Sequence, residues 1–294
     1  MPLEHRTAQV GSIRMHYVVE GTGPLVVLLH GFPEFWLSWR FQIPPLVEAG
    51  YRVVAPDLRG YNETDRTGPY DLDTLSLDVA ALVAHLGESR ATIVGHDWGG
   101  AITWHLAATQ PQLCDRIVVL NAPHPAVFAR ALRHSLRQLR RSWYIFFFQL
   151  PRLPERRLLK DGASLLRRIY LGNAVDRSHF TEEDVRPFRE AIAKPGAANA
   201  ALGYYRAAFR RMFQNRRGGE GFPRITCPTL LIWAKEDIAL DYSELVPPTN
   251  RWVSNLTIEP VERCGHFVHQ ERPEAVNALL LRFLRSPPPI VDAV

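Results

Sequence analysis

Short, continuous apolar runs separated by helical patterns constrain the fold of this chain more than any other feature. Apolar side chains on both faces of a strand are typical of a parallel sheet, because helices cover such a sheet on both sides. The alternation of these runs with helices predicts an α/β fold with a doubly wound, mostly parallel sheet. The expected strands lie at 13–19, 25–29, 52–57, 93–94, 117–120, 230–233 and 256–258.

The middle of the chain lacks this strand pattern and is rich in arginine, aromatic residues and helical spacing. We therefore predict a helical cap over residues 124–222, inserted into a core built from residues 1–123 and 223–294. A chain of 294 residues with 46% hydrophobic content can bury the large core of one such domain. Prolines, which mark turns and helix ends, stand at the edges of the cap at Pro123, Pro125, Pro223 and Pro228.

One predicted turn places Asp97 between glycines, in the stretch Gly95–Gly100. An apolar run at Arg90–Val94 precedes the turn, and Ala101–Ala108 follows it with the pattern of a helix. A turn of the form G-x-nucleophile-x-G needs glycines because its central residue is strained and the strand and helix backbones pass close together. Backbone N–H groups and the helix N-terminus point to the same place, so the turn can stabilise negative charge without a metal.

An aspartate in this position restricts the chemistry that the turn can perform. A carboxylate that attacks an acyl group forms an anhydride, whereas attack on a saturated carbon expels a leaving group and forms an alkyl ester. An epoxide oxygen and a halide are the two leaving groups that fit. The alternative is that Asp97 only caps the following helix.

Hydrolysis of such an ester needs a base late in the chain, and His266 in the segment Arg263–Phe267 is the best candidate. A carboxylate must orient this base, and Asp237 follows an apolar strand at the expected edge of the sheet, with Glu236 as the alternative. The order nucleophile, acid, histidine is the one expected on an α/β-hydrolase sheet. The competing histidines are His30, His96, His124 and His269.

Taken together, five motifs resemble the epoxide hydrolases of the α/β-hydrolase superfamily over almost the whole chain. The resemblance implies an eight-stranded, mostly parallel sheet with an inserted cap. It also implies that the backbone N–H groups of Phe32 and Trp98 form an oxyanion hole beside the substrate. The motifs are His30–Glu34 with Ser38–Arg40, Asp57–Tyr61, Gly95–Gly100, Leu120–Pro125 and Cys264–Phe267.

An epoxide oxygen leaves as an alkoxide, so hydroxyl donors should reach it from the cap. The segments Ser142–Pro151 and Lys194–Arg206 resemble the two cap segments that carry the family's paired tyrosines. By that match the donors, which also contact substrate, are Tyr144 and Tyr205. Tyr204 is the alternative to Tyr205, because a slip of one residue on a helix turns the side chain by about 100°.

We therefore predict an epoxide hydrolase that converts an epoxide and water to a vicinal diol through a covalent ester on Asp97, with no cofactor and no metal. Haloalkane dehalogenases share the Asp97-Trp98 pair and are one alternative, although the side chain of Phe32 cannot donate to a halide. A catalytically silent binding protein on the same fold is the other. A serine esterase does not fit, since no serine occupies the turn.

Charge and cysteine content complete the prediction. The net charge is +5, and the arginines concentrate between Arg130 and Arg168. A solvated helix face opposite an apolar leucine stripe accounts for the first of them, so we expect no nucleic acid partner. The arginines with helical spacing are Arg130, Arg133, Arg137, Arg140 and Arg141, and the leucines are Leu132, Leu136 and Leu139. Three scattered cysteines favour reduced thiols. We expect a small apolar epoxide as substrate, no membrane span and a cytoplasmic location, and we leave a homodimer open. Neither the identity of the epoxide nor the preferred enantiomer follows from these patterns.

Overall fold

The computed structural model describes residues 3–178, 180–214 and 222–286. They form one eight-stranded sheet in the order β1-β2-β4-β3-β5-β6-β7-β8. Neighbours from β4 onward are parallel, while β2 runs antiparallel to β1 and β4, which confirms the predicted mostly parallel sheet. The strands are β1 (Glu4–Val10), β2 (Ile13–Glu20), β3 (Leu25–Leu29), β4 (Arg52–Pro56), β5 (Ala91–His96), β6 (Cys114–Leu120), β7 (Thr229–Ala234) and β8 (Leu256–Val261).

The first strand, β1, was not predicted from the apolar runs. It lies at the edge of the sheet and pairs only with β2, and five of its seven residues are exposed. An edge strand with solvated faces does not need apolar side chains, and charged residues there discourage pairing with other chains. The pattern of apolar runs therefore detects the buried strands and misses this one.

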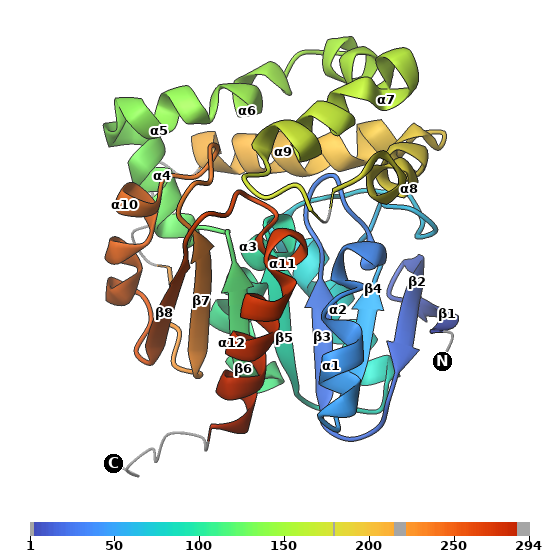
Figure 1. Cartoon of the computed structure of the whole chain (residues 1–294), viewed down its shortest axis with the longest axis vertical. Helices are drawn as coiled ribbons and strands as arrows, with labels where there is room; N and C mark the ends of the chain where they lie inside the picture. Colours follow the sequence, from blue (N-terminus) through green and yellow to red (C-terminus); the bar gives the residue numbers. More distant parts are fainter. Residues whose placement is uncertain (1–2, 179, 215–221, 287–294) are drawn as a thin grey trace.

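Helices cover both faces of the sheet (Figure 1). The helices α1 (Ile43–Glu48) and α12 (Pro273–Arg285) pack on one face, and α2 (Leu72–His85) and α3 (Trp98–Thr109) pack on the other. Successive side chains of the central strands enter the two layers alternately, and each layer is a core of buried apolar side chains. Shorter elements are η1 (Trp36–Trp39), η2 (Pro111–Leu113), α10 (Tyr242–Leu245), η3 (Pro247–Arg251) and α11 (Val268–Glu271).

The described residues between β6 and β7 are mainly helical and lie over the carboxyl ends of the central strands (Figure 1). This is the segment predicted as a cap over residues 124–222, and residues 215–221 near its end lie outside the described part of the chain. A third apolar cluster joins it to the core, where Phe267 stacks on Tyr170 with ring centroids 4.4 Å apart. The helices are α4 (Pro125–His134), α5 (Leu136–Arg141), α6 (Trp143–Phe147), α7 (Leu153–Asn173), α8 (Glu182–Ala193) and α9 (Ala197–Gln214).

The arginine-rich stretch of the cap differs from the single solvated helix face expected from the sequence. Ser135 is extended and separates α4 from α5, and its side chain accepts a hydrogen bond from the backbone N–H of Gln138 at 3.1 Å. A serine in this position is a favourable N-cap, so it begins a new helix rather than continuing the old one. Leu136, expected on a buried apolar stripe, is 73% exposed.

Candidate active site

Asp97 lies in the sharp turn between β5 and α3, with φ of 49° and ψ of −114°. A positive φ is strained in a residue with a Cβ, and such strain occurs mainly at functional sites. A Cβ added to Gly99 would lie 2.1 Å from the carbonyl oxygen of Leu29, and one added to Gly95 would lie 2.2 Å from that of Gly99. The glycines are therefore required by backbone packing, and the turn holds Asp97 above the end of the sheet.

The side chains of His266 and Asp237 approach Asp97 from two loops at the same edge of the sheet. His266 Nε2 lies 3.7 Å from Asp97 Oδ2, and His266 Nδ1 lies 2.7 Å from Asp237 Oδ2. The backbone N–H groups of Ala239 and Leu240 donate to Asp237 Oδ1 at 2.8 and 3.0 Å. The structure thus brings together the three residues predicted as nucleophile, base and acid, in an unbroken chain of contacts.

The charges in this chain shift the pKa values of its buried members. Burial alone would lower the pKa of His266, but the negative charges and hydrogen bonds of Asp237 and Asp97 hold it well above its usual value. Burial alone would raise the pKa of Asp237, but its contact with His266 brings that pKa below the usual value. Asp237 therefore stays ionised and can stabilise a protonated imidazole.

The backbone N–H of Phe32 donates to Asp97 Oδ1 at 2.8 Å. Trp98 is the first residue of α3, where the backbone N–H groups have no partner within the helix. Both N–H groups thus belong to turns at the carboxylate, in the positions expected of an oxyanion hole.

The two candidate tyrosines lie close together over this carboxylate. The ring of Tyr205 lies 6.0 Å from that of Tyr144, 5.3 Å from that of Phe32 and 5.0 Å from that of Trp98, measured between centroids. Burial is the largest cause, and the charge of Asp97 the next, of a raised pKa at both phenols. Each hydroxyl therefore keeps its proton and is available as a hydrogen-bond donor.

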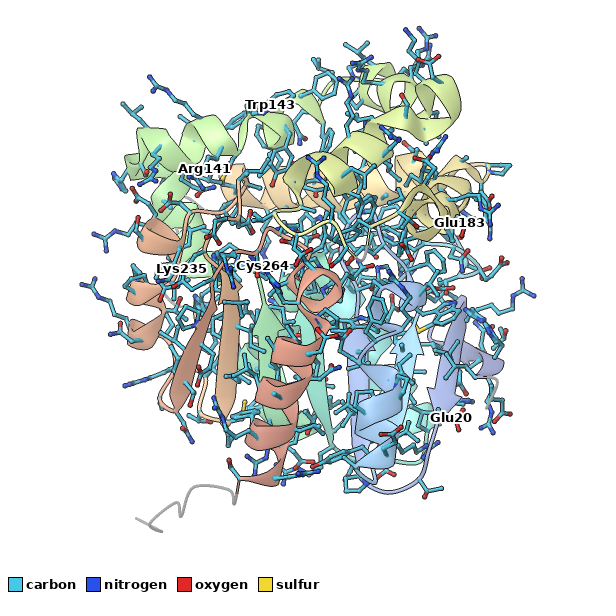
Figure 2. All side chains as sticks on the ribbon, viewed as in Figure 1. Glu20, Arg141, Trp143, Glu183, Lys235 and Cys264 are labelled. Atoms are coloured by element: carbon cyan, nitrogen blue, oxygen red, sulfur yellow. The ribbon has the colours of Figure 1, made fainter. Side chains whose placement is uncertain are left out.

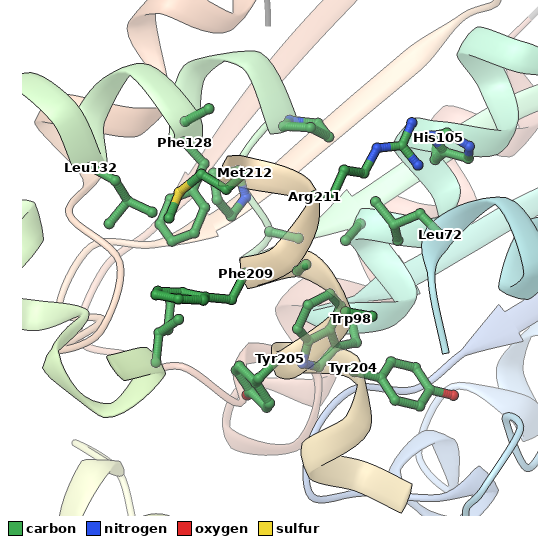
Figure 3. A pocket seen from close by; sticks show the side chains of 18 of the residues that line it. Leu72, Trp98, His105, Phe128, Leu132, Tyr204, Tyr205, Phe209, Arg211 and Met212 are labelled. Atoms are coloured by element: carbon green, nitrogen blue, oxygen red, sulfur yellow. The ribbon is translucent and has the colours of Figure 1, made fainter. Parts of the chain in front are cut away.

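Tyr204 leaves α9 in a different direction from Tyr205 (Figure 3). Its side chain is fully buried, and its hydroxyl donates to the backbone carbonyl of Arg59 at 2.6 Å. That hydrogen bond joins α9 to a core loop. The geometry thus separates the two neighbouring tyrosines, since only Tyr205 packs against Phe32 and Tyr144.

A cavity of about 270 Å³ lies next to Asp97, between α3 and the cap helices α4, α6 and α9 (Figure 3). Most of its lining is apolar, with Phe128 and Phe209 among the residues that close it. Tyr144 and Tyr205 also line the cavity, so the phenols and the carboxylate face the same space. Apolar walls with a few convergent polar groups are typical of a site for a small apolar molecule.

Residues 24–273 match the family model described as the α/β hydrolase fold. The chain is 33% identical over 292 residues to epoxide hydrolase 1 of Caenorhabditis elegans, covering 96% of this chain and 70% of that protein. The chain belongs to the epoxide hydrolases of the α/β-hydrolase family. The predicted family is therefore confirmed.

Two further relatives agree with this assignment. The AB hydrolase superfamily protein YfhM of Bacillus subtilis (strain 168) is 39% identical over 280 residues, covering 94% of this chain and 96% of that protein. The crystal structure of an epoxide hydrolase of Bacillus megaterium in complex with an inhibitor superposes with a TM-score of 0.88 at 29% identity. That comparison covers 96% of this chain and all of the other.

Asn121 is a part of the hydrolase site to which the sequence analysis gave no role. Its Nδ2 donates to Asp237 Oδ2 at 2.8 Å, and its Oδ1 accepts from the backbone N–H of Ala234 at 3.0 Å. The residue has a φ of 41°, a conformation that asparagine tolerates better than most residues. The signal available in the sequence was an asparagine directly after a buried strand.

Glu34 is a second residue to which the sequence patterns gave no role. Its hydrogen bonds support the loops of the hydrolase site. Glu34 Oε2 accepts from the backbone N–H of Gly31 at 2.9 Å and lies 2.9 Å from His96 Nδ1. The other ring nitrogen of His96 lies 2.9 Å from the carbonyl oxygen of His266. Burial would raise the pKa of Glu34, but His96 and His269 bring it well below its usual value, so this buried carboxylate is ionised. The network fixes the backbone on which His266 stands.

Within the described residues, one group of side chains has the spacing of a metal site. The potential ligand atoms of Glu34, His96 and His269 lie within 4.8 Å of one another. Both ring nitrogens of His96 already face hydrogen-bond acceptors, and Glu34 Oε1 accepts from Gln270 Nε2 at 2.7 Å. Hydrogen bonds account for the contacts of Glu34 and His96, whereas His269 Nε2 lies 3.5 Å from Glu34 Oε1 and neither of its ring nitrogens has a hydrogen-bond partner among the described residues. None of the three side chains belongs to the cavity lining.

None of the helices in the described residues is both long and apolar enough to cross a bilayer.

Proposed function

We propose that this enzyme converts an apolar epoxide to a vicinal diol in two steps, with Asp97 as the nucleophile. The observation that carries the proposal is that Asp97, Tyr144 and Tyr205 line one cavity. Behind the carboxylate, His266 Nε2 lies 3.7 Å from Asp97 Oδ2. A carboxylate needs a good leaving group on saturated carbon, and phenol donors make an epoxide oxygen such a group.

In the first step, Asp97 attacks a ring carbon of the epoxide and the bond between that carbon and the ring oxygen breaks. Tyr144 and Tyr205 donate hydrogen bonds to the oxygen, and one of them supplies the proton that turns it into a hydroxyl. The raised pKa of both phenols keeps them protonated before the reaction. The product is a hydroxyalkyl ester of Asp97, and the phenolate recovers its proton in the second step.

In the second step, water attacks the carbonyl carbon of the ester while His266 accepts a proton from the water. The charge that develops on the ester oxygen is stabilised by the backbone N–H groups of Phe32 and Trp98. Asp237 holds the imidazole through Nδ1 and stabilises its positive charge. The ester bond then breaks, and the leaving alkoxide takes the proton held by His266 to complete the diol. The carboxylic acid that forms carries one oxygen from water, and its proton returns to the phenolate, which regenerates the Asp97 carboxylate.

Isotope labelling tests the covalent route. In a single turnover in oxygen-18 water, the label should enter Asp97 and the first diol should be unlabelled, as measured by mass spectrometry of the peptide and the product. In the variant His266→Gln the first step should proceed while the second slows. The ester should then accumulate as added mass on the peptide that contains Asp97. Label found only in the first diol would show direct attack by water.

Halide release is the competing activity, since haloalkane dehalogenases use the same nucleophile. It needs N–H donors at the leaving group, and the Phe32 side chain that faces Tyr205 supplies none. Measurement of diol from an aryl epoxide beside halide from a short haloalkane separates the two activities. A cytoplasmic location stays a prediction from the sequence, and a homodimer stays open.

A further inference from the structure

The outer side of the cap carries large apolar side chains that no part of the described structure covers. Trp143 is 63% exposed, and Figure 2 shows it on the side of the cap that faces away from the sheet. Isolated exposed apolar residues are ordinary, but several on consecutive elements mark an interaction surface. We call the following set the cap patch: Leu136, Trp143, Phe146, Leu150, Leu153 and Leu159.

On α6, the exposed side chains of the cap patch are distinct from those that line the cavity. On α6, the side chains of Tyr144 and Ile145 face the cavity, whereas Trp143 and Phe146 are exposed. Trp143 and Phe146 are three residues apart and share one face of α6, and the exposed Leu150 follows after the helix ends at Phe147. Phe146 also packs edge-on against Phe209, with ring centroids 5.7 Å apart. The short helix thus has an inner face for the cavity and a partly exposed apolar outer face.

Positive charge surrounds the cap patch. Residues 125–160 contain eight arginines and one lysine, and their single acidic residue, Glu155, is paired with Arg206. Asp241 of the core neutralises only Arg137 and Arg141. The following exposed arginines form no ion pair with any residue in the described ranges: Arg130, Arg140, Arg152, Arg156 and Arg157.

We propose that the cap patch and its arginines dock the enzyme onto the surface of an anionic lipid bilayer. Leucine and tryptophan side chains enter the boundary between head groups and acyl chains, and arginines attract anionic head groups. A second copy of the chain is a poorer occupant, because two such faces repel each other. A nucleic acid is also poorer, because the exposed leucines have no role against phosphates and bases.

Docking in this orientation has a consequence for the supply of substrate. The helices α4 and α6 carry exposed arginines and cap-patch residues on one side, and they line the cavity with Phe128, Leu132, Tyr144 and Ile145 on the other. An apolar epoxide partitions into lipid, where its local concentration exceeds that in water. The docked enzyme therefore meets its substrate class at the surface where that class accumulates.

Sedimentation with vesicles tests the proposal with the full chain. Vesicles of phosphatidylcholine with phosphatidylglycerol should bind the enzyme at low ionic strength, and vesicles of phosphatidylcholine alone should bind at least roughly tenfold less. Added salt should weaken the binding, because screening shortens the range of the attraction. The double variants Trp143→Ser/Leu153→Ser and Arg152→Glu/Arg156→Glu should each reduce binding by about tenfold or more.

Matched controls remove residues of the same type far from the cap. Leu77 on α2 is 61% exposed, so Leu77→Ser removes one exposed leucine, as Leu153→Ser does within the first double variant. Arg251→Glu on η3 reverses one charge, as each substitution of the second double variant does. Both controls should bind vesicles as the wild type does. Circular dichroism and melting temperature establish that the variants are folded, and the arginine variant tests the proposal even where Trp143→Ser disturbs α6.

Four results would overturn the proposal. The first is no binding to anionic vesicles at low salt, and the second is binding that the two double variants leave unchanged. The third is a change of oligomeric state in light scattering, without vesicle binding, which identifies a second copy as the occupant. The fourth is tight binding of short duplex DNA. If DNA binds as tightly as the vesicles, and binds the Trp143→Ser/Leu153→Ser variant as tightly as the wild type, the surface is a general polyanion site. Each readout is independent of epoxide turnover.

Discussion

At the scale of single residues, Asp97 combines backbone strain with a dense set of contacts. Its φ is positive, Phe32 donates to one of its oxygens, and His266 lies beside the other. Such strain persists only where the surrounding structure holds it, which here means the close approach of Gly95 and Gly99 to neighbouring backbone. The carboxylate is held in place before any substrate arrives, and preorganisation of this kind would lower the barrier of the first step in the proposed mechanism.

The charge of Asp97 also controls the basicity of His266. In Asp97→Asn, the pKa of His266 should fall, because one of the two carboxylates that raise it is gone. Asp237 remains, so the pKa should stay above that of an equally buried histidine with no carboxylate beside it. Titration of the imidazole resonances by NMR measures this shift. Glu236→Gln is the matched control, since Glu236 accepts from the backbone N–H of Cys264 instead. An unchanged pKa in Asp97→Asn would contradict the assignment.

The sign of this shift has consequences for the reaction and for stability. Esterification removes the charge of Asp97 just as Asp97→Asn does, so His266 becomes neutral, and competent as a base, at lower pH in the ester than in the free enzyme. In the folded free enzyme the raised pKa of His266 stabilises the protein below the ordinary histidine pKa. That contribution is lost as the pH rises through the raised value.

The two neighbouring tyrosines allow a test within one turn of helix. Tyr205→Phe should slow ester formation by roughly a hundredfold or more in single-turnover measurements, because the leaving oxygen loses a donor. Tyr204→Phe should leave that rate close to the wild type and cost about 1 kcal/mol of stability, since its hydroxyl bonds to the Arg59 carbonyl. The reverse pattern would assign the catalytic role to Tyr204.

At the scale of elements, the site depends on how closely β5, α3 and β3 approach one another. Gly99→Ala should destabilise the protein by roughly 3 kcal/mol and abolish turnover, because its Cβ would meet the backbone carbonyl of Leu29. Chemical denaturation and diol assays measure the two effects. Gly172→Ala on α7, with no atom within 4 Å of the new Cβ, should change stability by less than about 1 kcal/mol. Equal effects of the two substitutions would show that close packing is not the cause.

At the scale of the whole molecule, core and cap are joined where the base is anchored. Glu271 Oε1 accepts from the backbone N–H groups of Val175 and Asp176 in the cap and from that of Gly265, the residue before His266. One buried carboxylate thus couples the position of the cap to that of the catalytic loop.

Removal of this link tests the coupling. Glu271→Ala should cost about 3 kcal/mol of unfolding free energy, because one buried and two partly buried N–H groups lose their carboxylate acceptor. It should also lower the rate of ester hydrolysis more than that of ester formation, since His266 acts only in the second step of the proposed mechanism. Denaturant unfolding and single-turnover kinetics check the two effects. Glu274→Ala, an exposed position on α12, serves as the control and should change neither. Equal slowing of both steps would show a general loosening of the site.

The sequence alone determined the parallel sheet and the turn that presents Asp97, because buried apolar strands and close backbone contacts restrict residue type locally. Their chain order also pointed to Asp237 and His266. Only the tertiary structure distinguished Tyr205 from Tyr204, placed Asn121 and Glu34 beneath the site, added the solvated strand β1 and exposed Leu136 on the cap. Those outcomes depend on which neighbours a side chain meets after folding, and contacts between residues far apart in the chain leave no periodic pattern in it.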